Sequence, residues 1–195
     1  MNGSQFRRCG SNVRIYASAK ILSPENIMFG SNIIIDDFVF IGSHRRLIIG
    51  NHVHIASHVS ITGGGDVLIS DFCGLSSGAR LISGTDDFTG GALTGPTIPL
   101  EFRDIRRGKI ILGAHAVVGA NSVVLPDVII GEGATIGAGS VVRRDLEPWG
   151  VYAGVPARQI KLRNREGVLD GERRLFEKYG CPEMQYRDSD SLEDW

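Results

Sequence analysis

The sequence lacks the features that mark membrane, secreted and nucleic-acid-binding proteins. Its longest uninterrupted apolar run is residues 38–41, far short of the roughly 20 residues that cross a bilayer, and no apolar stretch typical of a signal peptide opens the chain. The net charge is −1, from 21 basic and 22 acidic residues, which argues against broad electrostatic binding to nucleic acid or membrane. The three cysteines, Cys9, Cys73 and Cys181, have no paired spacing, so we expect a reduced, cytoplasmic setting.

Glycine, by contrast, is in excess. It supplies 26 of the 195 residues, about 13% against roughly 7% in an average protein. No Gly-X-Y period or low-complexity block accounts for the excess. Hydrophobic residues at 42% and charged residues at 22% are close to globular averages. The glycines are therefore expected at repeated backbone positions of one folded unit.

From residue 9 the chain follows a period of six, in which each hexad opens with a bulky apolar residue. Eighteen apolar openers at 42% per position have a chance probability on the order of 10⁻⁷. Glycine often follows the opener, and the fifth position is small or apolar. The openers are Cys9, Ile15, Ile21, Phe29, Ile35, Ile41, Ile49, Ile55, Ile61, Ile69, Leu75 and Leu81, then Leu112, Val118, Val124, Ile130, Ile136 and Val142.

A strict period of six fits neither a helix, which repeats at about 3.6, nor a flat strand, which repeats at about 2. It fits a short strand plus a turn, three of which close a triangular coil that stacks on the next at about 4.8 Å. The opener and the fifth residue then point inward, and the corners favour small polar residues. The sequence thus predicts an all-β fold, a parallel β-helix about 29 Å tall. Its six coils are 9–28, 29–48, 49–68, 69–111, 112–129 and 130–147.

The insertions in the repeat all fall at one corner. Extra pairs occur at 25–26, 45–46 and 65–66, each twenty residues after the last, so they lie in every third hexad. The one long interruption, about 85–108, falls in the next third hexad. We therefore expect a long excursion loop that leaves the coil at that same corner.

The hexad pattern stops after Val142. Turn signals follow at 148–150 and 154–156, and residues 166–179 have the spacing of a short amphipathic helix. Residues 187–195 are acidic and are expected to be loosely held. The predicted organisation is a coil domain over 1–163, then a C-terminal helix and acidic tail over 164–195.

The repeat resembles the left-handed β-helix of the hexapeptide-repeat acyltransferases over about residues 9–163. Residues 130–140 and 152–158 are similar to the C-terminal signature of the maltose, galactoside and antibiotic acetyltransferases, which use acetyl-CoA. A hexapeptide repeat alone specifies a fold rather than a reaction.

Four shorter stretches narrow the resemblance to a subgroup that acts on sugars for surface polysaccharides. Within that subgroup, the chain looks most like the N-acyltransferases of dTDP-4-amino-4,6-dideoxyglucose. The stretches are 53–56, 63–65, 71–72 and 86–88.

This resemblance implies transfer of an acetyl group from acetyl-CoA to the amino group of a nucleotide-linked amino-dideoxy sugar, in O-antigen or other surface polysaccharide biosynthesis. O-acetylation of a saccharide is the alternative. A homotrimer with active sites between subunits is also expected, because the outward residues Val117, Val123, Ile129 and Val141 are too apolar to face water.

The candidate catalytic residues are His58, His54 and Asp86. The galactoside and antibiotic enzymes carry a catalytic histidine after the coil that precedes the long loop, but residues 83–108 contain none. An amine acceptor needs less help than an alcohol once it is deprotonated, so this absence favours an amino sugar. His58 lies at a corner where the galactoside enzymes contact substrate, although a solvated corner is an alternative. His54 points outward from the preceding strand.

Asp86 stands where relatives place the histidine, although a solvated turn formed with Asp87 is the alternative. Asp87, Arg103 and Arg106 are the candidates for binding the sugar nucleotide, and loop surface is an equal alternative for the arginines. The remaining histidines, His44, His52 and His115, are expected at corners, with His52 at the surface.

By resemblance, CoA lies in a groove between subunits toward the C-terminal end. Small residues let the pantetheine arm pass close to backbone amides, and arginines suit its phosphates because of their fixed fork of donors. The positions that match the family's contacts are Ala114, Ala120, Ala138, Arg143, Arg144 and Arg158.

Two other classes of protein share features with this sequence. The γ-type carbonic anhydrases use the same coil with three zinc-bound histidines. Here His52 and His58 fall at different corners with no histidine one coil away, so no metal is expected. A non-catalytic scaffold is the second class, and the arginines of the C-terminal signature argue against it.

Overall fold

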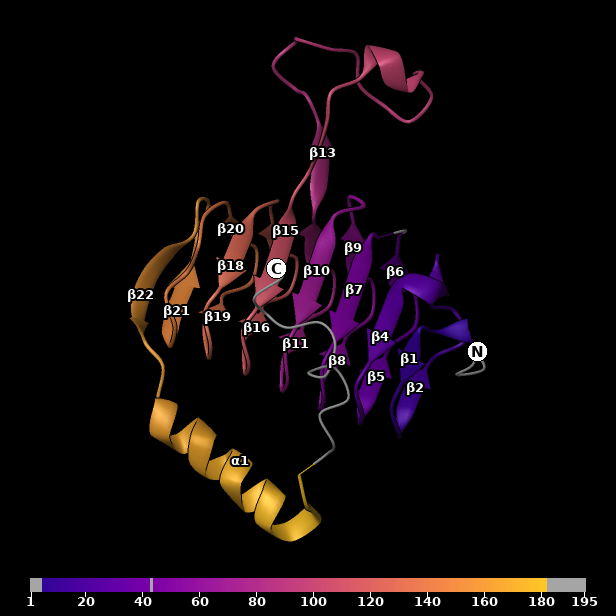
Figure 1. Cartoon of the computed structure of the whole chain (residues 1–195). Coiled ribbons are helices and arrows are strands. Elements are labelled where there is room, and N and C mark those ends of the chain that lie inside the picture. Colours follow the sequence, from indigo (N-terminus) through magenta and orange to yellow (C-terminus); the bar gives the residue numbers. More distant parts are fainter. Residues whose placement is uncertain (1–4, 43, 182–195) are drawn as a thin grey trace.

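The computed structural model describes residues 5–42 and 44–181. Three parallel sheets form the walls of a left-handed triangular coil, one helix follows a corner, and a ribbon projects from another corner (Figure 1). The predicted all-β, left-handed parallel β-helix is confirmed. The predicted acidic tail beyond Cys181 lies outside the described residues.

Each turn of the coil adds one strand to each of three sheets, which we call A, B and C. Sheet A contains β1 (Arg8–Cys9), β4 (Ile27–Phe29), β7 (Arg46–Ile49), β10 (Asp66–Ile69), β15 (Lys109–Leu112) and β18 (Val128–Ile130). Sheet B contains β2 (Val13–Ile15), β5 (Ile33–Ile35), β8 (His54–Ile55), β11 (Gly74–Leu75), β16 (Val117–Val118), β19 (Thr135–Ile136), β21 (Gly150–Ala153) and β22 (Arg158–Leu162). Sheet C contains β3 (Lys20–Ile21), β6 (Phe40–Ile41), β9 (Ser60–Thr62), β12 (Arg80–Ile82), β17 (Val123–Val124) and β20 (Val141–Val142).

The predicted inward columns are confirmed. Ile15 pairs with Ile35 and Ile35 with Ile55, so openers lie directly above openers. Ile35 and Ile55 are completely buried. Because aligned apolar side chains exclude water along the whole coil, stacking them supplies the core.

The coil continues beyond the last predicted hexad. Strand β21 pairs in parallel with β19, placing Tyr152 beside Ile136, and Leu146 bridges Ile130 at the end of sheet A. Both Tyr152 and Leu146 are 5% exposed. The six predicted coils are therefore followed by a partial seventh turn, which forms without the hexad spacing. Strand β22 then pairs antiparallel to β21.

The long excursion leaves between sheets C and A, at the corner predicted from the insertions. Its stem is an antiparallel ribbon of β13 (Gly84–Asp86) and β14 (Ile105–Arg107). Two short 3₁₀ helices occur at this corner or in the excursion, η2 (Pro24–Asn26) and η3 (Leu100–Phe102).

His44 braces the base of this ribbon. Its Nδ1 lies 3.2 Å from the carbonyl oxygen of Gly65, and its Nε2 lies 3.1 Å from that of Ile61. The turn between these residues packs against the stem so tightly that a Cβ on Gly63 would lie 2.1 Å from the nitrogen of Gly84. His44 lies at a corner, as expected, and is buried there.

Helix α1 (Arg165–Tyr179) matches the predicted helix. Asn164 caps its first turn by accepting a hydrogen bond from the amide of Gly167, and Gly180 follows its last residue with φ of 80°. Both end residues are of the types that favour helix termini.

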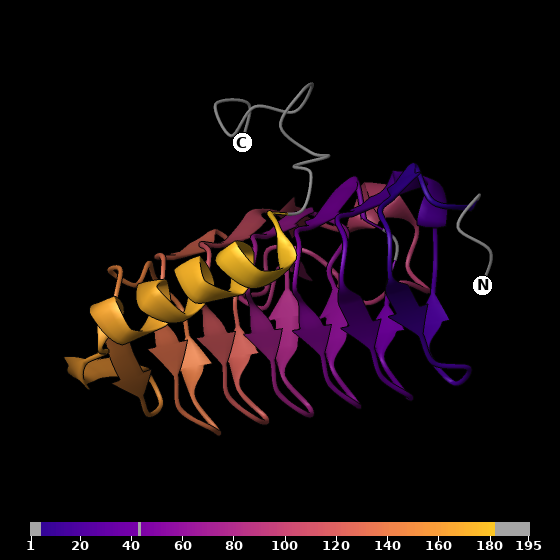
Figure 2. The ribbon, with the colours of Figure 1, turned by 90° about the horizontal axis from the view of Figure 1, so that it is seen from below.

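Helix α1 lies along the corner between sheets A and B (Figure 2). There His52, Phe72 and His115 stack with ring centroids 4.8 and 4.9 Å apart. From α1, Phe176 contacts Phe72, and Glu172 pairs with Nε2 of His115 at 3.0 Å. Both histidines lie at a corner, as expected, but His115 is buried and His52 is half-buried. Burial lowers the pKa of His52, which favours its neutral ring.

Adjacent residues on β5 test the inward and outward assignment. Ile35 is completely buried and Ile34 is 39% exposed. We expect Ile35→Ala to lower the free energy of unfolding by about 2–5 kcal/mol because it leaves a cavity, and Ile34→Ala to change it by within about 0.5 kcal/mol. Urea unfolding followed by circular dichroism measures both. Equal losses of unfolding free energy in the two variants would contradict the assignment of Ile35 as inward and Ile34 as outward.

Candidate active site

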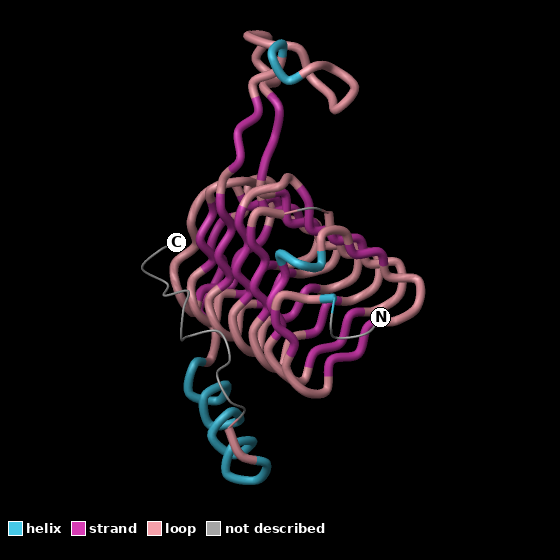
Figure 3. The backbone as a smooth tube through the Cα atoms, turned by 45° about the vertical axis from the view of Figure 1, so that its right-hand side comes forward, coloured by secondary structure: helices cyan, strands magenta, loops and turns pink. Residues whose placement is uncertain are grey.

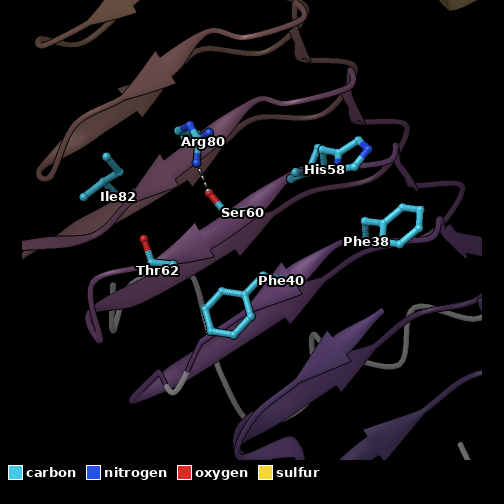
Figure 4. A pocket seen from close by; sticks show the side chains of 8 residues that line it. Phe38, Phe40, His58, Ser60, Thr62, Arg80 and Ile82 are labelled. Atoms are coloured by element: carbon cyan, nitrogen blue, oxygen red, sulfur yellow. Dashed lines mark hydrogen bonds between the residues drawn. The ribbon is translucent and has the colours of Figure 1, made fainter. Parts of the chain in front are cut away.

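Two open grooves flank the corner between sheets B and C. The groove on sheet C has a volume of about 440 Å³ (Figure 4). The groove on sheet B is smaller, about 280 Å³. The residues lining the first include Phe38, Phe40, His58, Ser60, Thr62, Arg80 and Ile82, and those lining the second are His54, Ala56, Gly74, Leu75, Ser76 and Ser77. The candidate catalytic histidines therefore line neighbouring grooves.

His58 stacks on Phe38 in the sheet C groove. The ring centroids are 5.1 Å apart and the ring planes differ by 6°. Both residues hold the left-handed conformation, with φ of 64° and 63°, which is uncommon outside glycine. Within the described part of the chain the His58 ring has no hydrogen-bond partner, so both nitrogens can serve a ligand.

Gly78, directly above His58, does not leave the open space that its missing side chain suggests. A Cβ there would lie 2.2 Å from Oδ1 of Asn121, so the amide of Asn121 occupies that space. A ligand therefore approaches His58 from the groove and from beyond Phe38.

His54 lies beside open space. Its Nε2 pairs with Oδ2 of Asp36 at 3.0 Å, which orients the imidazole. On the next coil Gly74 pairs with His54, and a Cβ on Gly74 would meet no atom within 4 Å. Ser76 lines the same groove. A carboxylate-oriented histidine beside free volume is suited to accepting a proton.

Sequence reasoning missed Arg80, Phe40 and Ser76. Phe40 pairs with Ser60 and Ser60 with Arg80, so the three form one outward column on sheet C. The spacing of twenty residues that aligned Phe38 with His58 also identifies this column. Arg80 donates a long hydrogen bond of 3.4 Å to the hydroxyl of Ser60, which leaves most of its donors available.

Asp86 joins two other parts of the excursion through hydrogen bonds. Oδ2 accepts a hydrogen bond from the amide of Gly95 at 2.7 Å, and Oδ1 accepts one from Arg103 at 2.6 Å. The Asp86 and Arg103 side chains are 14% and 13% exposed. The Gly95 amide and then the Arg103 guanidinium lower the pKa of Asp86, so its carboxylate is a weak proton acceptor.

Asp87 and Arg106 also have partners within the chain. Asp87 accepts hydrogen bonds from the hydroxyl and amide of Thr89 and from the amide of Gly91, and these lower its pKa. Arg106 forms a forked contact with Asp127, at 2.6 and 3.1 Å, and is 73% exposed. The structure therefore brings Asp86 to Arg103 but does not bring Asp87 to either arginine.

The ribbon points away from the coil (Figures 1 and 3). It leaves from the corner between sheets C and A, whereas His54 and His58 flank the corner between sheets B and C. Within one chain, the structure does not bring Asp86 to these histidines.

The residues expected to contact CoA lie at separate sites in the structure. Arg144 and Arg158 line one groove of about 370 Å³, while Arg143 lies outside it. Ala120 and Ala138 lie at the corner between sheets B and C, where the carbonyl of Ala120 accepts a hydrogen bond from Gly139. Ala114 lies at the corner between sheets A and B, which α1 follows.

Buried thiol chemistry is excluded at Cys73. Burial raises its pKa to about 12, so the thiol is protonated and enclosed. Among residues 5–42 and 44–181, no group of three or more histidine, cysteine, aspartate or glutamate side chains is arranged to hold a metal ion. No helix in the same residues has the length and hydropathy needed to span a membrane.

Comparisons with known proteins show which family the chain belongs to. Residues 109–144 match the family model of the bacterial transferase hexapeptide, six repeats. The chain is 40% identical to a dTDP-4-amino-4,6-dideoxy-D-glucose acyltransferase of Escherichia coli, over 83% of this chain and 84% of that protein. It is 34% identical to the putative lipopolysaccharide biosynthesis O-acetyl transferase WbbJ of Escherichia coli K12, over 73% of this chain and 64% of that protein.

A solved structure of an N-acyltransferase is also similar to this chain. A variant of AntD, an N-acyltransferase from Bacillus cereus in complex with dTDP and coenzyme A, is 38% identical and superposes with a TM-score of 0.84. The match covers 89% of this chain and 94% of that chain.

The Asp86–Arg103 pair gives a direct test of the excursion's order. Asp86→Asn removes the charge that Arg103 needs, so we expect proteolysis within 87–104 to become several-fold faster while the circular dichroism of the coil is unchanged. Glu101→Gln, an exposed carboxylate in the same excursion, is the matched control and should leave the rate unchanged. An unaltered rate in Asp86→Asn would show that this pair does not hold the excursion.

Proposed function

The chain belongs to the family of hexapeptide-repeat acyltransferases, and on this basis we propose that it transfers an acetyl group from acetyl-CoA to the amino group of a nucleotide-linked amino-dideoxy sugar. The 40% identity to the Escherichia coli dTDP-4-amino-4,6-dideoxy-D-glucose acyltransferase carries this proposal. AntD, in complexes with coenzyme A and dTDP-4-amino-4,6-dideoxyglucose, supports the same class of acceptor. Such a product suits O-antigen or another surface polysaccharide. The unpaired spacing of the three cysteines supports a cytoplasmic enzyme.

The reaction needs a group that takes the proton of the acceptor amine. The amine nitrogen attacks the thioester carbonyl, the C–N bond forms, the C–S bond breaks, and the departing thiolate takes up a proton. His54 is the candidate proton acceptor, because Asp36 orients its ring and Gly74 leaves space beside it. His58, with both nitrogens unpartnered within the described residues, contacts the sugar from the adjoining groove.

The sheet C groove suits a nucleotide. The rings of Phe38 and Phe40 are 61% and 37% exposed, which favours stacking with a base. Arg80 offers a guanidinium fork to a diphosphate. Arg103 is already paired with the carboxylate of Asp86, so Arg80 is the better candidate for this contact. Arg106 and Asp87 remain candidates at the excursion.

Coenzyme A fits the groove of Arg144 and Arg158, whose guanidinium groups suit its phosphates. Arg143 flanks this groove as a further candidate. The small residues Ala120 and Ala138 line the corner that leads from it toward His58, so a pantetheine arm can pass close to the backbone. Ala114 lies at a different corner and is the weakest of the expected contacts.

A cyclic homotrimer completes the site. The tip of the excursion exposes large apolar side chains in one chain, which a neighbouring subunit would cover. Cyclic symmetry then places each ribbon, with Asp86 at its stem, against the B–C corner of the next subunit. The exposed apolar residues are Phe88 at 84%, Leu93 at 56%, Leu100 at 69% and Phe102 at 57%.

O-acetylation of a saccharide is the second candidate, favoured by the 34% identity to WbbJ. AntD has also been solved with 3-hydroxybutyryl-CoA, so a larger acyl donor belongs beside acetyl-CoA in any assay.

A thiol-release assay with matched acceptors tests the proposed reaction. We expect acetyl-CoA to release CoA when dTDP-4-amino-4,6-dideoxyglucose is present, and not with the same nucleotide sugar bearing a 4-hydroxyl, because only the amine is nucleophilic enough without an activated alcohol. Mass spectrometry of the product should show one added acetyl group. Release with a plain hexose or glycoside, and none with amino-dideoxy sugar nucleotides, would establish the O-acetyl alternative instead.

A further inference from the structure

The groove on sheet C changes in chemical character along its length. Its end at the B–C corner carries the stacked rings of His58 and Phe38. Its middle carries the guanidinium group of Arg80 beside the hydroxyl of Ser60. The groove then continues toward the corner between sheets C and A, beyond both of these parts (Figure 4).

That far end is lined by Phe40, Thr62 and Ile82, and we call these three residues the distal end of the groove. Thr62 and Ile82 pair in register on β9 and β12. The same outward column continues below Thr62 with Gly42, where a Cβ would lie 3.7 Å from the ring of Phe40. An aromatic ring, a hydroxyl and an aliphatic side chain therefore meet at the distal end.

Buried hydrogen bonds hold the backbone of the distal end in place. The carbonyl oxygen of Thr62 accepts hydrogen bonds from the amide and the hydroxyl of Ser83, at 2.7 and 2.9 Å. Ser83 is completely buried, so water does not compete for these bonds. The hydroxyl of Thr62 itself has no partner among residues 5–42 and 44–181. It is therefore available both to donate a hydrogen bond to a ligand and to accept one.

We propose that the distal end binds the base of the nucleotide sugar, with the diphosphate at Arg80 and the sugar at His58. This assignment rests on the proposed function. A nucleotide sugar has its diphosphate between the sugar and the nucleoside, and Arg80 lies between the two ends of the groove. The reacting amine must reach the B–C corner, because His54 and His58 flank that corner. The base then occupies the distal end.

The reverse orientation would separate the amine from any proton acceptor. Positions 58 and 62 are four residues apart, which is about 13 Å of extended chain. Proton transfer needs heavy atoms within about 3.2 Å of one another. The distal end offers only a phenylalanine, a threonine and an isoleucine, none of which is a base at neutral pH. Chemistry at the amine therefore requires the sugar at the B–C corner.

The distal end also favours one kind of base. Stacking on Phe40 is open to every base, because each has an aromatic face. The Thr62 hydroxyl suits the oxygen and N–H groups that thymine and uracil share. Ile82 adds aliphatic surface beside this hydroxyl, and apolar side chains recognise the 5-methyl group of thymine. We therefore expect thymine to bind more tightly than uracil.

Isothermal titration calorimetry with dTDP and dUDP tests the assignment, because these nucleotides differ only in the 5-methyl group. We expect the wild type to bind dTDP about fourfold more tightly, which is the effect of burying one methyl group. Ile82→Ala should abolish this preference. Leu22→Ala is the matched control and should keep it. Leu22 is 38% exposed in the same outward column, one coil before Gly42 and outside the groove.

Two further variants test the other contacts. Phe40→Leu should weaken both nucleotides at least about fivefold, because it removes the stacking ring. Arg80→Gln should weaken both at least about tenfold and leave their ratio unchanged, because it removes a charged contact to the diphosphate. Circular dichroism checks that each variant folds. Ile82→Val, a smaller change, replaces Ile82→Ala if that variant does not fold, and should reduce the preference.

Three results would overturn the assignment and leave the proposed function in place. They are equal binding of dTDP and dUDP by the wild type, a preference that survives Ile82→Ala, and a preference that Phe38→Leu abolishes instead. Binding of neither nucleotide would overturn the assignment as well. Only the absence of CoA release with dTDP-4-amino-4,6-dideoxyglucose would count against the proposed function itself.

Discussion

Backbone hydrogen bonds between successive coils hold each strand residue directly above its counterpart in the previous coil. In the first coils the counterpart is twenty residues earlier, as for Ile15, Ile35 and Ile55. After the excursion it is eighteen residues earlier, as for Ile110 and Val128. Because the strands are only two to four residues long in most turns, no single coil buries enough apolar surface to be stable alone. The repeated register therefore sets the core, the outer columns and the corners together.

The candidate site follows from this alignment. Outward columns place Phe40, Ser60 and Arg80 in one groove, and His54 and Gly74 in another. The two grooves share a corner, so a donor and an acceptor can meet across it without any residue leaving its column. The excursion is the exception to the alignment. It projects from a different corner, and we propose that a second subunit brings its ribbon to this site.

Much of the fold could be predicted because each hexad repeats the same pattern, an inward apolar residue followed by a turn. The contacts of individual side chains could not be predicted from this pattern. His44 is held by two carbonyl oxygens, and His115 is covered by Glu172 from a helix 57 residues away in the chain. Gly74 and Gly78 look equivalent in the repeat, yet only Gly74 borders open space, because Asn121 occupies the space beside Gly78. These differences depend on residues that the repeat does not constrain.

The central claim is that the reaction takes place between subunits, at a corner of one coil and the ribbon of the next. Subunits with His58→Ala and subunits with Asp86→Ala, unfolded and refolded together in equal amounts, test it most directly. A shared site needs an intact corner from one subunit and an intact ribbon from its neighbour, so about a quarter of the wild-type activity should return under cyclic closure. If each variant alone is inactive and the mixture stays inactive while refolded wild type recovers, the site does not combine these two parts of neighbouring subunits.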